Sequence, residues 1–351
     1  MKTLRLLPLL ILLCPSAHAS RPEALRSPWD SKPVALSSIP YHCPPAVPIS
    51  PDISITARLD DEDNPTPDAV KEAVYAESTH ALNQFTNHFV HAADNYRDTG
   101  SPEAAKCAIE LIAAAAEGNA MAGNMASRLA WQHQNSTLRA AAIAYLKVRG
   151  SGVIRPDQSS VILDWMTGIV QQERFYYEHL SCGKKSCDLL GHRGLEVALA
   201  TAAIGIARND RGMLKWGIDQ YRTAVESIGA SGTLHYDNKG RYALRSNDES
   251  AASLVLIAEL AQANGEQLYD YDHGRIQILV HTVTRGLVDP SPFRAANHAD
   301  QLIASPLTSA EVSWLAPYNS RFPDPVAASL IQQAGPAGAD VWGGDPPEPT
   351  Q

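Results

Sequence analysis

The first clearly helical part of the chain is residues 66–90, which read TPDAVKEAVYAESTHALNQFTNHFV. Thr66 is a good helix cap, Pro67 suits a first helical turn, and the acid Asp68 favours a helix N-terminus. Apolar residues then recur at roughly helical spacing: Val70, Ala73, Val74, Leu82, Phe85, Phe89 and Val90. The pattern predicts a long helix with one apolar face.

Similar signals repeat from this helix to residue 334. Ser101-Pro102-Glu103 opens a second helix, and Gly118 can close it. Further helices are predicted at about residues 119–133, 135–149, 157–179, 191–208, 210–229, 248–264, 274–288, 308–318 and 324–334. Strand signals are scarce, and Ala-rich stretches such as 113–116 and 197–203 allow close packing. A series of antiparallel helical hairpins predicts an all-α bundle, solenoid or α/α toroid, and the absence of a fixed repeat period weakens the solenoid.

The two ends of the chain have a different composition. Residues 1–19 resemble an export signal, since Lys2 and Arg5 precede a short apolar run and Ala17-His18-Ala19 offers a cleavage pattern. The Pro- and Ser-rich residues 20–65 are predicted to form an extended arm, residues 66–334 the helical domain, and residues 335–351 a loosely ordered tail. No later segment is long and apolar enough for a membrane helix, so we expect a periplasmic or secreted protein without membrane insertion.

Cysteines remain at four positions once the signal is removed. An even count in an exported chain indicates two disulfides, for which three pairings exist. We favour Cys43–Cys107, which would pin the arm to a helix, and Cys182–Cys187, which would close a small loop. The CxxC and CxxH spacings of structural zinc sites are absent, so a metal site is the weaker interpretation.

Charge and motifs limit the function classes. The net charge of −9 argues against nucleic acid as a partner. Residues 180–245, however, carry ten Lys or Arg against six Asp or Glu, which gives +4 there and −13 elsewhere. Such a region could bind an acidic polysaccharide, or its charges could be scattered along solvated helix faces. No phosphate loop, dinucleotide fingerprint, HExxH or GxSxG motif is present, so we expect no cofactor and no metal, and we expect a monomer.

Two predicted loops concentrate polar residues that could carry chemistry. The first, 181–193, ends in Leu190-Gly191-His192-Arg193, and the second, 232–248, contains Tyr236, Arg241 and Tyr242. Histidine, tyrosine and arginine between helices suit proton transfer beside a carboxylate, although a lone histidine is more often structural.

Several stretches resemble, in order, the mannuronate-specific alginate lyase family. They are Lys106-Cys107-Ala108-Ile109, Ala144-Tyr145-Leu146-Lys147, His192, Asn209-Asp210 through Trp216, Gly232-Thr233-Leu234, Leu254 through Gly265, Ser313-Trp314-Leu315-Ala316-Pro317-Tyr318 and Gly343-Gly344-Asp345. The resemblance covers most of the mature chain. It implies an (α/α) toroid, or incomplete α/α barrel, that cleaves an acidic polysaccharide by β-elimination.

The resemblance also implies site residues. His192 matches the histidine of the family's Asn-Asn-His motif, and Arg241 matches its arginine after a small gap. The motif's second asparagine is replaced by Gly191, and the family tyrosine falls near Ser246, so Tyr242 or Tyr236 would have to substitute. We therefore predict His192, Arg241 and Tyr242 as catalytic residues. The predicted substrate contacts are Arg58, Arg193, Tyr236, Lys239, Arg245 and Trp314, of which Trp314 could equally pack in the core.

These departures leave the function open between three hypotheses. The first is an exported lyase for a uronic-acid polymer, either alginate or a glucuronan-like exopolysaccharide. The second is a non-catalytic protein of the same fold that binds polysaccharide or assists its export. The third is a helical glycoside hydrolase, which would need two carboxylates across a groove, with Asp237 and Asp248 as candidates.

Overall fold

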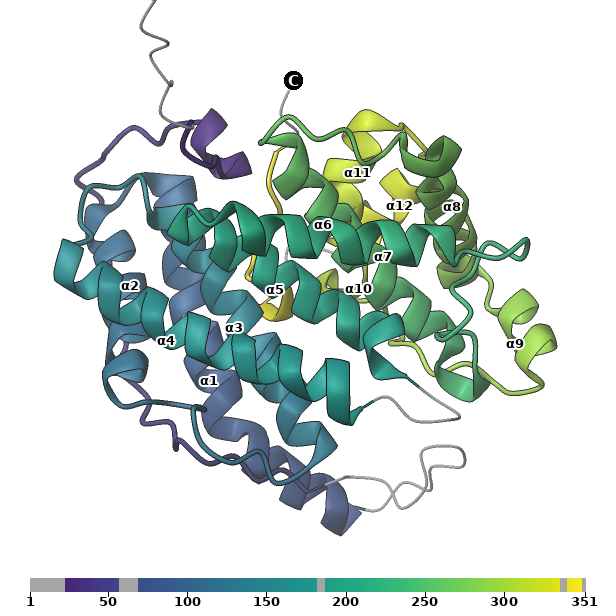
Figure 1. Ribbon diagram of the computed structural model, residues 1–351, viewed down its shortest axis with the longest axis horizontal. Helices are drawn as coiled ribbons and strands as arrows, with labels where there is room; N and C mark the ends of the chain where they lie inside the picture. Colours follow the sequence, from purple (N-terminus) through teal and green to yellow (C-terminus); the bar gives the residue numbers. More distant parts are fainter. Residues whose placement is uncertain (1–22, 57–68, 182–186, 335–339, 349–351) are drawn as a thin grey trace, which may run out of the picture.

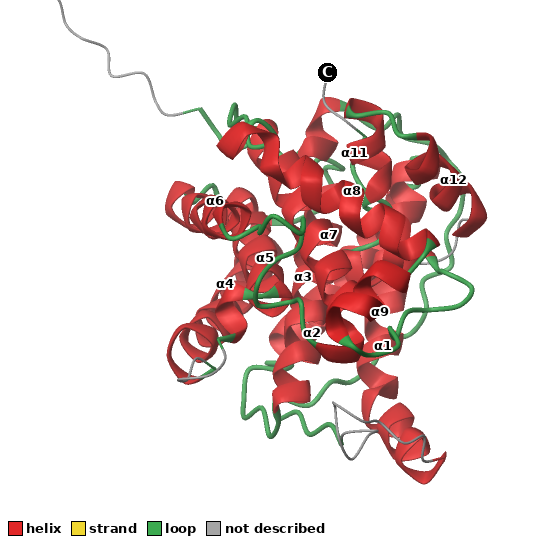
Figure 2. Cartoon of the chain, turned by 90° about the vertical axis from the view of Figure 1, so that its right-hand side faces the viewer, coloured by secondary structure: helices red, strands yellow, loops and turns green. Residues whose placement is uncertain are grey.

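The computed structural model describes residues 23–56, 69–181, 187–334 and 340–348. Figure 2 shows that these residues form helices joined by loops, and within them no strand occurs beyond the isolated bridges Ile53–Met125 and Ile228–Leu234. No helix in this part of the chain has the length and apolarity needed to cross a membrane. The described structure is therefore all-α.

The described α-helices are α1 (Ala69–Thr99), α2 (Pro102–Glu117), α3 (Arg128–Val148), α4 (Pro156–Phe175), α5 (His192–Arg208), α6 (Arg211–Glu226), α7 (Ala243–Gln262), α8 (Arg275–Val288), α9 (Ser291–Asn297), α10 (Ser309–Val312), α11 (Leu315–Arg321) and α12 (Pro325–Ala334). Short helical turns also occur: η1 (Pro28–Ser31) before α1, the π-helical η2 (Tyr176–Leu180), η3 (Asp188–Leu190), η4 (Gly240–Tyr242) and η5 (Tyr271–Gly274) between the helices, and η6 (Asp340–Trp342) after α12.

The helices are arranged as an inner row with partners beside it. Helices α1, α3, α5 and α7 pack each against the next, and each also packs against the helix that follows it in the chain (Figure 1). Near the C-terminus, α11 packs on α7, α12 packs on α8, and η6 returns to α1 and α3. This arrangement is the predicted α/α toroid. It places the first residues of the parallel helices α3, α5 and α7 toward one end of the molecule.

Some predicted helix bounds were wrong. The predicted break near residue 134 does not exist, because α3 runs unbroken from Arg128, where the side chain of Ser127 accepts a hydrogen bond from Ala130 N. Residues 119–127 instead form a loop that pairs with the arm at Ile53. The predicted helix at 308–318 is divided between α10 and α11, and α9 was not predicted. The start of α3 is set by the Ser127 cap, and the loop before it by its pairing with the arm, neither of which the apolar pattern carries.

Helix α5 is buried by close contact with its neighbours. From Gly194 to Ile206 nearly every residue is buried, and most are Ala, Gly or other small residues. A Cβ on Gly217 of α6 would lie 2.8 Å from both the carbonyl oxygen of Ala198 and the Cβ of Ala202. Small residues therefore allow α5 and α6 to approach backbone to backbone, which holds the first turn of α5 in a fixed place.

Two buried cations on α3 fasten the C-terminal segment to the inner row. Lys147 Nζ binds the carboxylate of Asp94 and donates to the carbonyl oxygen of Gly343 at 2.7 Å. Arg139 donates to the carbonyl oxygen of Val341 at 2.7 and 3.0 Å, and its guanidinium lies 4.2 Å from the Trp342 ring centroid. These bonds satisfy charges that would be costly to bury alone.

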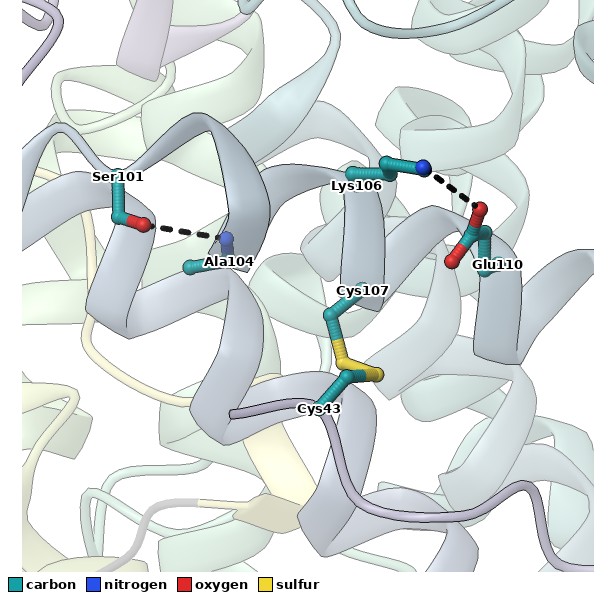
Figure 3. Close-up of a disulfide and its surroundings, with 6 residues drawn as sticks. All are labelled: Cys43, Ser101, Ala104, Lys106, Cys107 and Glu110. Atoms are coloured by element: carbon teal, nitrogen blue, oxygen red, sulfur yellow. Dashed lines mark hydrogen bonds and ion pairs between the residues drawn. A yellow bond between two sulfur atoms is a disulfide. The ribbon is translucent and has the colours of Figure 1, made fainter. Parts of the chain in front are cut away.

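A disulfide ties the N-terminal arm to the toroid. Cys43 and Cys107 are joined, with their Cα atoms 5.5 Å apart, and Figure 3 shows the arm running beside α2 at this point. Ser101 caps the same helix by accepting from Ala104 N. The predicted Cys43–Cys107 pairing is confirmed. In the predicted Cys182–Cys187 pairing, Cys187 is disulfide-bonded, while Cys182 lies outside the described residues.

We expect Gly217→Ala to destabilise the protein by about 1–3 kcal/mol, because the added methyl group would overpack the α5–α6 contact. The control is Gly168→Ala on α4, where a Cβ meets no atom within 4 Å. That substitution should stabilise the helix by about 0.5–1 kcal/mol. Urea unfolding monitored by circular dichroism measures both. A Gly217→Ala midpoint at or above wild type would contradict the packing argument.

Candidate active site

His192 is the first residue of α5, and one carboxylate oxygen holds it in two ways. Asp237 Oδ1 accepts the backbone N–H of His192 at 3.0 Å and the Nδ1–H of its ring at 2.9 Å. An acceptor at this place satisfies one of the free N–H groups of a helix start, and its charge suits the positive end of the helix. The same contact fixes both the ring orientation and the proton on Nδ1.

Asp237 is itself held firmly. Its side chain is 3% exposed, and its second oxygen accepts from Ser250 Oγ of α7 at 2.6 Å. The loop that carries it is anchored to α7 through Leu234 N, which donates to Asn247 Oδ1 at 2.8 Å. The carboxylate therefore has partners on both oxygens, and it bridges the start of α5 to the first turns of α7.

The other ring nitrogen of His192 faces a second carboxylate. Nε2 lies 3.5 Å from Glu249 Oε2, and the remaining oxygen of Glu249 accepts from Arg245 Nε at 2.9 Å. Burial alone would raise the pKa of Glu249, but Arg245 and His192 outweigh it and hold that pKa below its ordinary value. Arg245 and Glu249 lie one turn apart on α7, so a single helix face supplies this ion pair.

The environment of His192 favours its charged form. Burial opposes the charge, but the hydrogen bond to Asp237 and the nearby carboxylates of Asp237 and Glu249 are stronger together, so the pKa of His192 lies above its ordinary 6.5. The ring remains reachable, because its side chain is 17% exposed. A histidine of this kind can exchange a proton with a ligand near neutral pH.

The geometry explains why residue 191 is glycine. A Cβ on Gly191 would lie 2.7 Å from Asp237 Oδ1 and 3.8 Å from the Cβ of Tyr236. The carboxylate of Asp237 thus reaches the space that a side chain at position 191 would need. Where the family resemblance predicts an asparagine beside the histidine, this chain has an aspartate that comes from another loop, with Tyr236 beside it.

Arg193 and Arg245 lie near His192 but are already paired. Arg193 Nη1 lies 3.7 Å from Asp188 Oδ1, and Arg193 also donates to the side-chain carbonyl of Gln132 on α3. Arg245 binds Glu249, as described above. Both were predicted substrate contacts. Glu249 balances the charge of Arg245, whereas Arg193 shares Asp188 with Arg128, so one positive charge remains in excess among these ion pairs.

Lys239, Arg241 and Tyr242 lie in or next to η4. Lys239 Nζ sits 5.9 Å from the Tyr236 ring centroid, and Tyr242 lies within electrostatic range of Arg245. The backbone of Arg241 is fixed because its carbonyl accepts from Leu302 N at 2.8 Å. Within the described ranges, no hydrogen bond or ion pair joins Arg241 or Tyr242 to His192, and the side chains of Lys239 and Arg241 have no ion-pair partner.

Two further substrate contacts were predicted, at Arg58 and Trp314. Arg58 lies outside the described residues. Trp314 is 1% exposed, and its indole N–H donates to Asp248 Oδ1 at 3.1 Å and to the carbonyl oxygen of Glu311 at 2.9 Å. Trp314 is therefore a core residue, and the prediction that it contacts substrate was wrong. Its large apolar ring fills the space between α7 and α10.

The pairing of Asp237 and Glu249 with His192 was not predicted from the sequence. Asp237 was considered only as half of a hydrolase pair with Asp248. Asp248 is buried against Trp314 and Asp237 is buried against His192, so these two carboxylates do not face each other across an open groove. In the part of the chain that the structure describes, no group of three or more His, Cys, Asp or Glu side chains is placed to hold a metal ion.

Comparison with known proteins identifies relatives of this chain. The family model described as alginate lyase matches residues 49–293. A polysaccharide lyase of Stenotrophomonas maltophilia (strain K279a) is 26% identical over 307 residues, 86% of this chain and 89% of the relative. An alginate lyase of Pseudomonas syringae pv. syringae (strain B728a) is 23% identical over 267 residues, 75% of this chain and 69% of the relative.

Solved structures share the fold. Alginate lyase A1-III from Sphingomonas species A1 matches with a TM-score of 0.70 at 17% identity, covering 92% of this chain and 89% of that one. A variant of alginate lyase A1-III complexed with a tetrasaccharide matches with a TM-score of 0.72 at 17% identity, covering 86% and 83%. Since the family model spans well over half of the sequence, this chain belongs to the alginate lyase family and is a polysaccharide lyase that acts by β-elimination.

Proposed function

We propose that this lyase is exported and cleaves a uronic-acid-containing polysaccharide, with His192 as the base. The observation that carries the proposal is the double hydrogen bond from His192 to Asp237. With the proton of the neutral ring held on Nδ1, Nε2 carries the lone pair that can accept a proton. The side chain of His192 is partly exposed, which allows a sugar to reach it.

The reaction assigned to His192 is β-elimination at a uronate. Nε2 takes the C5 proton, the C5–H electrons form the C4–C5 double bond, and the C4–O4 bond breaks. The departing O4 needs a proton, for which Tyr236 and Tyr242 are the candidates from the same loop. Ser246 occupies the place near the family tyrosine and is buried, so it is a poor candidate.

A lyase must also neutralise the uronate carboxylate, because that makes the C5 proton acidic. Arg245 and Arg193 are already paired with Glu249 and Asp188. Lys239 and Arg241 have no ion-pair partner within the described residues, so they are the proposed carboxylate-binding cations. Both follow Asp237 closely in the same loop, so they lie near the residue that holds the base along the chain.

The proposed substrate is a β-linked uronate polymer such as mannuronan or glucuronan. The relatives named alginate lyase support an acidic substrate, and the neighbour complexed with a tetrasaccharide supports an oligosaccharide-binding fold. Export to the periplasm or medium is supported by the signal-like residues 1–19 and by the Cys43–Cys107 disulfide, since such bonds persist in oxidising compartments.

Activity on uronate polymers should depend on His192. The purified protein should produce the ultraviolet absorbance of an unsaturated uronate on at least one of polymannuronate, polyguluronate, glucuronan and hyaluronan. His192→Ala should lower that rate by about 10²–10⁴-fold, the usual range for loss of a general base. His80→Ala, an exposed histidine on α1, is the control and should leave the rate unchanged. Binding without product on every polymer would instead support a non-catalytic, polysaccharide-binding role.

The pH dependence of kcat/KM should follow the titration of His192. His192 acts as a base only when neutral, so kcat/KM should rise with pH through a pKa above 6.5. Asp237→Asn removes the carboxylate that raises this pKa, so the rise should move to lower pH while kcat falls, because the ring loses its orientation. Glu249→Gln should move the rise in the same direction and keep the Asp237 contact. A pH profile that neither substitution moves would rule out His192 as the titrating base.

A further inference from the structure

A cavity of about 600 Å³ lies beside the active-site end of the molecule, between the α2–α3 loop, the first turn of α3 and the C-terminal half of α4. Helices α3 and α4 run side by side here (Figure 1). The volume is in the range of small-molecule pockets. Among the described residues, none of the side chains that line the cavity carries a charge. Its walls consist of glycines, the amides of Asn124, Gln171 and Gln172, and apolar or aromatic groups.

The aromatic part of the lining is a stacked pair. The rings of Trp131 and Tyr176 lie 4.4 Å apart between centroids with an interplanar angle of 10°. Phe175 and Leu180 also line the cavity and are 57% and 64% exposed. Burial raises the pKa of Tyr176, which keeps its phenol neutral. Flat apolar surfaces suit the C–H faces of a pyranose ring, and amides suit its hydroxyl groups.

Ion pairs connect this cavity to His192. Arg128, at the start of α3, binds both oxygens of Asp188 at 2.9 and 2.6 Å. Asp188 in turn lies 3.7 Å from Arg193, which follows His192, and Tyr176 is within electrostatic range of all three charged residues. The cavity and the base therefore lie at the same end of the toroid, and the ion pairs Arg128–Asp188–Arg193 connect them.

We propose that this cavity is a subsite for an uncharged sugar residue of the same polysaccharide chain. A uronate placed there would lose water from its carboxylate without a cation in the lining to replace it, which is costly. Arg128 and Arg193 share the carboxylate of Asp188, and neither of them lines the cavity. This inference rests on the proposed function and narrows its substrate class from uronate polymers in general to a heteropolysaccharide, with a uronate at His192 and a neutral or acylated pyranose in the cavity.

The proposal can be tested by a substitution that fills the cavity from a position with room for a larger side chain. Gly168 lines the cavity, and a Cβ there meets no atom within 4 Å, so Gly168→Phe should fold and occupy the space. Gly150→Phe is the matched control, since Gly150 is equally open and does not line the cavity. A second pair, Phe175→Ala with Val161→Ala as its control on the same helix, serves if Gly168→Phe does not fold.

Binding of mannohexaose and cellohexaose is measured by calorimetry in the His192→Ala background, so the readout does not depend on turnover. We expect at least one neutral hexasaccharide to bind, and Gly168→Phe to weaken it by about tenfold or more while Gly150→Phe does not. In the active protein, Gly168→Phe should raise KM on a polymer that alternates uronate and neutral sugar, with kcat unchanged. It should leave KM on polymannuronate unchanged.

The outcomes separate the two proposals. Equal binding of the neutral hexasaccharides to Gly168→Phe and Gly150→Phe, or no binding of either sugar, overturns the subsite even if the lyase is active. A larger loss for a mannuronate hexamer than for the neutral sugars overturns the assignment of an uncharged occupant. Loss of neutral-sugar binding in Gly168→Phe, together with no lyase activity on any polymer, supports the subsite and rejects the proposed substrate class.

Discussion

The contact between Asp237 and the start of α5 is the interaction on which the rest of the site depends. One oxygen of this carboxylate accepts both the backbone N–H and the Nδ1–H of His192. This one oxygen therefore caps the helix, orients the ring and fixes the proton on Nδ1. Because Asp237 is almost fully buried, losing either partner would leave a costly unpaired group. Stability and reactivity thus depend on the same bond.

The packing of the toroid holds this contact in a fixed position. Helix α5 packs against α3, α6 and α7, and its small residues leave it no room to shift. Helix α7 then supplies three side chains over little more than one turn: Arg245, Glu249 and Ser250. Ser250 holds Asp237 from behind, and Glu249 faces the opposite edge of the ring. Helices α5 and α7 therefore fix the surroundings of both ring nitrogens of His192, and the loop between them contributes the carboxylate of Asp237.

The sequence predicted the helices better than the contacts between them. Apolar periodicity and caps indicated most inner-row helices, because those signals are local. The break at residue 134 was wrong, because polar residues such as Gln134 and Asn135 interrupt the apolar pattern although the structure buries them. His192 could be found from its place in a family motif. Its partner Asp237 could not, because 45 residues separate them and only folding brings them together.

Charge balance at the site explains how an anionic sugar could be accepted beside two carboxylates. Asp237 is matched by His192, and Glu249 is matched by Arg245, so neither pair presents a net charge to a ligand when the ring is protonated. Lys239 and Arg241 add positive charge without a matching acid in the described structure. When His192 is neutral and ready to act as a base, the negative charge of Asp237 is no longer matched by the ring, and those two cations offset it. The site can then hold an anionic substrate beside a neutral, reactive histidine. This requires both Lys239 and Arg241, which belong to the same loop as Asp237.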